Sequence, residues 1–204
     1  MKIIGTILII ICLAADVAIG AFLYRKAYGQ DELVNGLTVT ELINRPAVQY
    51  DYAAHKFGFT APGNFLSDGG TASQGIIDFL YSVSNNKEDK INPSISVIVT
   101  MDRVMKEDFT SEQYKNLSKN DFPSNTDSQY VYKNGGVYVN KNGIKFLYDT
   151  VSLFNTEAGM RTTEKKYTFF HNGNMYDIVW VDNEEDFDGT VAEFDRLIDT
   201  VKTY

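Results

Sequence analysis

The stretch "RTTEKKYTFFHNGNMYDIVWVD", Arg161 to Asp182, decides the fold. Two arms rich in aromatic and β-branched residues flank Asn172-Gly173, and such residues favour strands. An Asn-Gly pair between two such arms is the strongest short-range signal for a β-hairpin. The stretch therefore predicts two long antiparallel strands joined at this turn.

The residues that follow predict a helix packed on the sheet. Apolar side chains recur at helical spacing, namely Phe187, Val191, Phe194, Ile198 and Val201. This spacing places them on one face of an α-helix. Acids at 184–186 crowd the start, where the helix macrodipole favours negative charge.

Further strands are expected upstream of the hairpin. "SISVIVTM", from Ser94, is almost continuously apolar and is typical of a central strand. "GIIDFLYSV", from Gly75, also indicates a strand, and "VQYDYAAHKFGFTAP", from Val48, indicates two strands joined by a tight turn. Two more Asn-Gly pairs, Asn134-Gly135 and Asn142-Gly143, predict hairpin turns.

Two helices are expected outside the C-terminal region. Thr38 and Glu41 have the spacing of a capping box, and Pro46 would end the short helix that they begin. "TSEQYKNLSKNDF", from Thr110, has a helical period with Thr110 as the cap. The predicted fold is α+β, with a mostly antiparallel central sheet flanked by helices as an α/β/α sandwich.

The N-terminal residues predict a membrane segment. The run from Ile3 to Tyr24 is apolar except for Asp16, and at about 1.5 Å per residue it spans roughly 33 Å, enough for a bilayer core. It closes on Arg25-Lys26, which favours an uncleaved, single-pass anchor with the domain on the extracytoplasmic side. The alternative is a signal peptide cut near Ala18–Gly20, which would give a secreted protein.

A lipid-attachment site at Cys12 is disfavoured because Ile11, which is not a small residue, precedes it. The chain is therefore divided into a membrane anchor or signal segment (1–28), a linker with a short helix (29–47) and an α/β/α domain (48–204).

Composition argues against several functions. Acids number 27 against 19 Lys and Arg, for a net charge of −8, and such a surface repels the phosphates of nucleic acids. Cys12 is the only cysteine, so the globular part has no thiol nucleophile. His55 and His171 are the only histidines, and no Ser or Thr has an obvious activating base. No catalytic residue is predicted.

A calcium loop is the strongest metal motif, and we reject it. "EEDFDGTVAEFD" places acids at loop positions 1, 3, 5 and 12, namely Glu184, Asp186, Asp188 and Asp195. However, the Glu at position 1 and the Asp at position 12 reverse the usual choice. A calcium loop would also break the helical face that begins at Phe187. No metal and no cofactor is predicted.

The loop from Pro62 to Ser73 is the leading candidate for a partner contact. It is rich in Gly and Ser, and it carries Phe65 and Leu66 as candidate apolar anchors. The alternative is that these two side chains fold back on the core.

Three segments resemble PsbP-like domains. "YDYAAHKFGFTAPGNF" resembles their opening hairpin, "SISVIVT" with "TSEQYKNL" their next strand and helix, and "KKYTFFHNGNMYDIVWV" with "FDRLIDTVKTY" their closing hairpin and terminal helix. The resemblance covers Val48 to Tyr204 and implies an α/β/α sandwich. Members include a photosystem II extrinsic subunit and a Ran-binding import factor, which bind and assemble and do not catalyse. An uncleaved anchor departs from the lumenal photosynthetic members.

We therefore expect a non-enzymatic binding or assembly module, tethered to the lipid bilayer and bound to a protein partner. The alternatives are a secreted or cell-envelope hydrolase that uses carboxylates, and a calcium-dependent envelope module.

Overall fold

The computed structural model describes residues 39–67, 76–82, 93–100, 130–155 and 159–204. Two antiparallel sheets account for most of them. The smaller sheet has the order β1-β2-β10 and the larger one the order β3-β4-β5-β9-β8-β7-β6. The strands are β1 (Val48–Tyr52), β2 (Phe57–Ala61), β3 (Phe65–Ser67), β4 (Ile76–Ser82), β5 (Ser94–Thr100), β6 (Tyr130–Val139), β7 (Lys145–Asn155), β8 (Met160–His171), β9 (Asn174–Asn183) and β10 (Lys202–Thr203).

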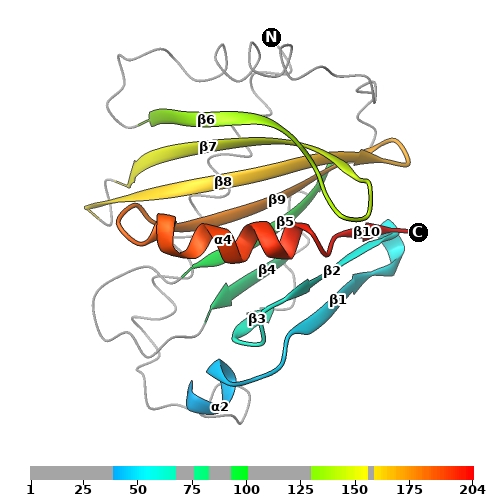
Figure 1. The fold of residues 1–204 in the computed structure, drawn as a ribbon, viewed down its shortest axis with the longest axis horizontal. Helices are drawn as coiled ribbons and strands as arrows, with labels where there is room; N and C mark the ends of the chain where they lie inside the picture. Colours follow the sequence, from blue (N-terminus) through cyan, green and yellow to red (C-terminus); the bar gives the residue numbers. More distant parts are fainter. Residues whose placement is uncertain (1–38, 68–75, 83–92, 101–129, 156–158) are drawn as a thin grey trace.

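The helical elements are fewer: α2 (Val39–Ile43), the 3-10 turn η1 (Ala53–His55) and α4 (Phe187–Ile198). Helix α4 lies across one face of the large sheet, with the small sheet beside it (Figure 1). The α+β class is thus confirmed, with strands predominating. The helix expected from Thr110 lies outside the described residues, so the second helical layer of the expected sandwich stays a prediction.

The hairpin expected at Asn172-Gly173 is confirmed. Strands β8 and β9 pair in an unbroken antiparallel register from Thr162↔Asn183 to His171↔Asn174. Asn172 has φ 50° and Gly173 φ 76°, the left-handed backbone that a two-residue type I′ turn requires at both positions. Asn-Gly suits this turn because Gly carries no Cβ and Asn tolerates positive φ.

The turn predicted at Asn134-Gly135 is wrong. Both residues lie inside β6, beside a bulge between Tyr132 and Asn134, and the chain turns only at Asn142-Gly143. A Cβ on Gly135 would lie 2.5 Å from the Tyr132 hydroxyl and 2.7 Å from the Tyr148 carbonyl oxygen. This glycine therefore serves close packing inside a strand.

Helix α4 buries the face that its apolar spacing predicted. Phe187, Phe194 and Ile198 are buried, and Phe194 stacks on Trp180 of β9 with ring centroids 5.3 Å apart. Val201 is also buried, but the helix has ended at Ile198. The chain continues from there into β10, which pairs with β2. The sequence did not predict β10 because two residues carry no periodic signal.

The core between the sheets and α4 is largely aromatic. Phe57 contacts Phe169 and Tyr176 edge-on, and Tyr52 stacks on Phe57. The Asp78 carboxylate joins the two sheets because it accepts hydrogen bonds from Tyr52 of β1 and from Ser67 of β3, both at 2.6 Å. The largest fully buried side chains are Trp180, Tyr176, Phe57, Phe59, Phe65, Phe146, Phe169, Phe194, Leu42, Leu80, Ile95 and Ile178.

Candidate functional site: a tyrosine and aspartate surface beside helix α4

The two candidate partner contacts lie in the core. Phe65 and Leu66 form the start of β3, with exposed fractions of 1% and 4%, and the Phe65 ring packs against Trp180 at 5.5 Å. Phe65 and Leu66 lie opposite Ser82 and Tyr81 of β4, and Phe65 belongs to the main hydrophobic core. A partner could touch them only if β3 moved, so their contact role stays a prediction.

The four acids of the rejected calcium motif lie in different settings. Helix α4 begins at Phe187, so Asp188 and Asp195 are helical and no twelve-residue loop forms. Glu184 lies before the helix, bonded to Ser152 at 2.8 Å and paired with Lys133 at 3.0 Å. In the part of the chain that the structure describes, no three His, Cys, Asp or Glu side chains gather as metal ligands would.

The membrane segment Ile3 to Tyr24 lies outside the described residues. None of the helices within 39–67 or 130–204, or in the short ranges between them, has the length and apolar character needed to cross a bilayer.

The structure instead brings together a polar and aromatic group that the sequence did not indicate. It is formed by Tyr138 (β6), Tyr148 (β7), Lys165 and Tyr167 (β8), Asp195 (α4) and Asp199, the residue directly after α4; we call it the Tyr–Asp surface. These residues come from four elements, and all but Tyr167 keep part of their surface exposed.

Lys165 occupies the centre of the Tyr–Asp surface. Its ammonium lies 2.6 Å from Asp195 Oδ1 and within 5.4 Å and 5.1 Å of the ring centroids of Tyr148 and Tyr167. Tyr167 donates to the same Asp195 oxygen at 2.9 Å. Only 12% of the Lys165 side chain is exposed, against 41% of Asp195. The lysine is thus fixed by one carboxylate and two rings, and the carboxylate faces solvent.

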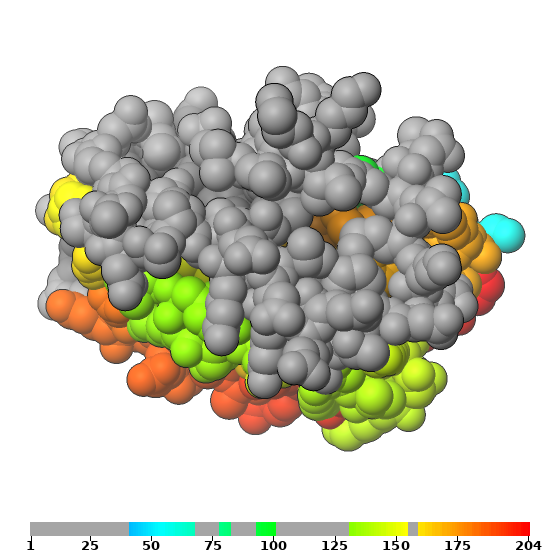
Figure 2. Space-filling model, turned by 90° about the horizontal axis from the view of Figure 1, so that it is seen from above, coloured from blue at the N-terminus to red at the C-terminus, as the bar shows by residue number. Residues whose placement is uncertain are grey.

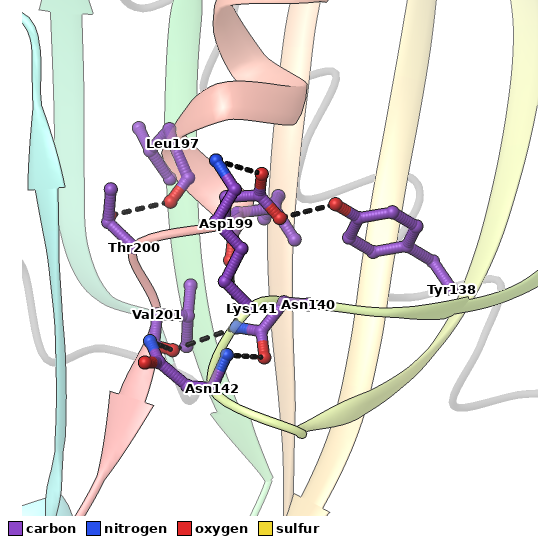
Figure 3. A network of polar contacts seen from close by, with 9 residues as sticks. Tyr138, Asn140, Lys141, Asn142, Leu197, Asp199, Thr200 and Val201 are labelled. Carbon is purple, nitrogen blue, oxygen red and sulfur yellow. Dashed lines mark hydrogen bonds and ion pairs between the residues drawn. The ribbon is translucent and has the colours of Figure 1, made fainter.

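The end of α4 is held by the turn after β6 (Figure 3). Asn140 donates from Nδ2 to the carbonyl oxygens of Ile198 and Val201 at 3.0 and 2.8 Å, and Asn142 donates to Val201 at 2.8 Å. Asp199 accepts from the Tyr138 hydroxyl and pairs with Lys141 at 2.9 Å. These contacts fix the position of Asp199 relative to β6.

Electrostatics keep Tyr138 and Tyr167 neutral. The hydrogen bond to Asp199, with some burial, raises the pKa of Tyr138 to about 12, and burial together with the Asp195 charge raises the pKa of Tyr167. The bond from Tyr138 and the pairing with Lys141 lower the pKa of Asp199. At neutral pH the hydroxyls of Tyr138 and Tyr167 are therefore donors and not bases, and the Asp199 carboxylate is charged.

The sequence held only a partial signal for this surface. Lys165 and Tyr167 are two residues apart in a predicted strand, so they point to the same face of the sheet. Asp195 and Asp199 are four residues apart at the predicted helix, so they lie on the same side of it. Nothing local shows that the two pairs meet, since that depends on where α4 crosses β8. Neither histidine belongs to the surface: His55 lies in η1, and His171 contacts Asn172 at the hairpin turn.

No protein-family model matches the chain, and no curated protein does so either. Among solved structures, the chain is similar to CyanoP, the cyanobacterial PsbP of Synechocystis, with a TM-score of 0.55 at 14% identity, covering 78% of this chain and 93% of that one. It is also similar to LpqN of Mycobacterium tuberculosis, which is involved in cell envelope biogenesis, with a TM-score of 0.51 at 9% identity, covering 79% and 87%.

The class of the protein follows: it is an α+β domain dominated by antiparallel sheet. Within that class it has the PsbP-like fold, as its sequence segments predicted. Identities this low show the fold alone, so the function has to be argued from the chain's own residues.

Proposed function

We propose that the chain is a non-catalytic binding or assembly module whose Tyr–Asp surface contacts a protein partner. The observation that carries the proposal is the state of its polar groups. Tyr138 and Tyr167 are held protonated, and Lys165 is fixed on Asp195. General-base or nucleophilic chemistry instead needs a group whose pKa is shifted towards neutral pH, so that it can lose or accept a proton there. Aromatic rings with directed donors and a charged acceptor instead suit recognition.

The exposed side of Asp195 indicates which kind of partner side chain would bind at this surface. Asp195 keeps 41% of its side chain exposed although one of its oxygens already holds Lys165 and Tyr167. A cationic side chain of a partner, above all a planar Arg, could pair with the free edge of this carboxylate and stack on Tyr148. The overall charge of −8 favours the approach of such a partner.

We further propose that the domain is tethered to a membrane by residues 3–24 and lies on the extracytoplasmic side. The apolar run and its closing Arg25-Lys26 support this placement. The fold likeness to an envelope-related protein is compatible with it. Fractionation of cells followed by N-terminal sequencing tests it, and a soluble form that begins near Ala21 would contradict the anchor.

Site-directed photocrosslinking tests the contact. A photoreactive phenylalanine analogue at Tyr148 should give one discrete adduct in intact cells, and Asp195→Lys in the same chain should abolish it. The same analogue at Tyr204, which is 53% exposed but lies beside Phe57 and Asp51, is the matched control and should give none. Equal adducts from both positions would contradict the site. Turnover of an envelope ester or glycoside that is lost in Asp195→Asn would favour the hydrolase alternative.

A further inference from the structure

Strand β6 is the last strand of the large sheet among the described residues, and part of it is open to solvent. It pairs with β7 along one side. Val131 and Val139 near its two ends are 46% and 57% exposed, and Lys133 and Asn134 between them are exposed as well. Figure 2 shows atoms of β6 at the surface of the molecule. An edge strand of ten residues is a template for pairing with another strand.

The sequence of β6 is close to self-complementary when it is paired antiparallel with itself. It reads "YVYKNGGVYV", so Tyr-Val-Tyr at one end would lie against Val-Tyr-Val at the other. Because the bulge makes Lys133 and Asn134 share one position of the ladder, a two-fold axis at Gly135 places Val131 opposite the second copy's Tyr138, and Tyr132 opposite its Val137. Pairs of an aromatic with a β-branched residue are among the favourable cross-strand pairs.

The bulge makes this register possible. In a regular strand, residues 131 and 138 would point to opposite faces because their numbers differ by an odd count. The extra residue between Tyr132 and Asn134 reverses the alternation. Val131, which lies opposite Ser152, then shares the face of α4 with Tyr138, while Tyr132 packs on the other face against Val151 and Leu153. In each of the two cross-strand pairs, the two side chains therefore point to the same face of the sheet.

Charge does not oppose the pairing. Lys133 is the single charged residue of β6, and it would lie opposite Gly136 of the second copy. Its charge is balanced within its own chain by Glu184, at 3.0 Å. Although the whole chain carries −8, the edge itself brings no two like charges together.

We propose that two copies of this chain associate through their β6 strands, antiparallel about a two-fold axis at Gly135, so that the two large sheets become continuous. Such an interface is isologous and closes on itself, so it gives a dimer and no fibre. The Tyr–Asp surface remains on the α4 face, and the dimer would present it twice.

Sedimentation of the full chain in a mild detergent tests the dimer. Wild type should sediment as a dimer, and Val131→Lys with Val139→Lys should be at least tenfold weaker in association, because charges on an edge strand oppose strand addition. Ile43→Lys, which adds the same charge at a side chain exposed to 41% in α2, should leave association unchanged. A monomeric wild type, or a double variant that dimerises as well as wild type, would overturn the proposal.

Cross-linking tests the register independently of the detergent. In membranes, on a Cys12→Ser background, Asn134→Cys should be joined to its copy by a short bismaleimide. Lys145→Cys is the control: it lies beside Val139 at the end of the hairpin, so in the proposed dimer the two copies of this residue are separated by about 30 Å, the length of the strand. Cross-links at Lys145→Cys and none at Asn134→Cys would show that another surface forms the dimer.

Discussion

At the scale of the residue, Asp195 shows how one carboxylate can organise a surface. It lies on the last turns of α4 and accepts from Lys165 and Tyr167, which both project from β8. The lysine is mostly buried, so the pair is less screened by water than a pair on the open surface. Loss of the carboxylate would leave a cation among rings without its partner.

We therefore expect Asp195→Ala to lower the free energy of unfolding by about 1–2 kcal/mol, measured in denaturant melts. The exposed side of Asp195 moderates the loss. Asp188→Ala, an exposed acid at the other end of the same helix, is the control and should change stability by less than about 0.5 kcal/mol. Equal effects of the two substitutions would show that the Lys165 pair contributes nothing.

Phe194 belongs to the same scale. It is fully buried between Trp180 and Tyr167, with ring centroids at 5.3 and 5.5 Å. Phe194→Ala should cost about 3–5 kcal/mol in denaturant melts, because it removes this packing and leaves a cavity. A loss below about 1 kcal/mol would mean that α4 does not press on the sheet at this point.

Glu164 makes stability depend on pH. Burial raises its pKa to about 8, although Lys166 nearby opposes the rise. Between the pKa of the unfolded chain, near 4.5, and about 8, the folded state therefore binds more protons than the unfolded state. Stability should fall as pH rises through this window, by up to about 1.4 kcal/mol per pH unit.

Glu164→Gln removes this titration, so melts at pH 5, 6, 7 and 8 should lose that slope relative to wild type. Glu184→Gln is a useful contrast, since the pKa of Glu184 is lowered by Lys133 and Ser152. Its stabilising contribution is present above the unfolded pKa and is lost only as pH falls below it. An unchanged slope in Glu164→Gln would show that this carboxyl titrates normally.

At the scale of the element, the turn between β6 and β7 acts as a clamp on α4. Asn140 is buried; its amide nitrogen reaches Ile198 and Val201, and its Oδ1 accepts from the backbone of Asn142 and Ile144. One side chain thus donates to the last carbonyl of a helix and to a carbonyl three residues beyond it, and it also shapes a turn far away in sequence.

Asn140→Ala should lower the free energy of unfolding by about 2–3 kcal/mol, because it leaves buried carbonyl and amide groups without their hydrogen-bond partner. Lys141→Ala, whose side chain is 77% exposed, should cost less than about 0.5 kcal/mol. Hydrogen exchange should show the loss of protection at the end of α4 and in the turn together. Protection lost in the turn alone would mean that the two elements are not coupled.

The pair Phe65 and Leu66 is tested at the same scale. Because both lie in β3 and Phe65 packs on Trp180, replacing them with Ser should cost more than about 3 kcal/mol. Partner binding lost while stability stays unchanged would instead support the contact role predicted from the loop composition.

At the scale of the whole molecule, local signals determined the elements. Asn172-Gly173 and Asn142-Gly143 predict turns because these two residue types themselves favour the backbone conformation of the turn. The spacing of the apolar residues from Phe187 to Ile198 predicts α4 because it matches the period of an α-helix. The order of these elements, together with the segments that resemble PsbP-like domains, is enough for the sequence alone to predict the α+β class and the PsbP-like fold.

Tertiary structure alone decided how those elements meet. The Asn134-Gly135 pair has the sequence typical of a turn, yet it lies in a strand, where Asn134 pairs with Thr150 and Gly135 with Asp149 of β7. Phe65 is buried because β3 places it against Trp180 of β9, and Lys165 meets Asp195 because α4 crosses β8. Contacts of this kind depend on register and crossing between segments distant in the chain, so no window of sequence contains them.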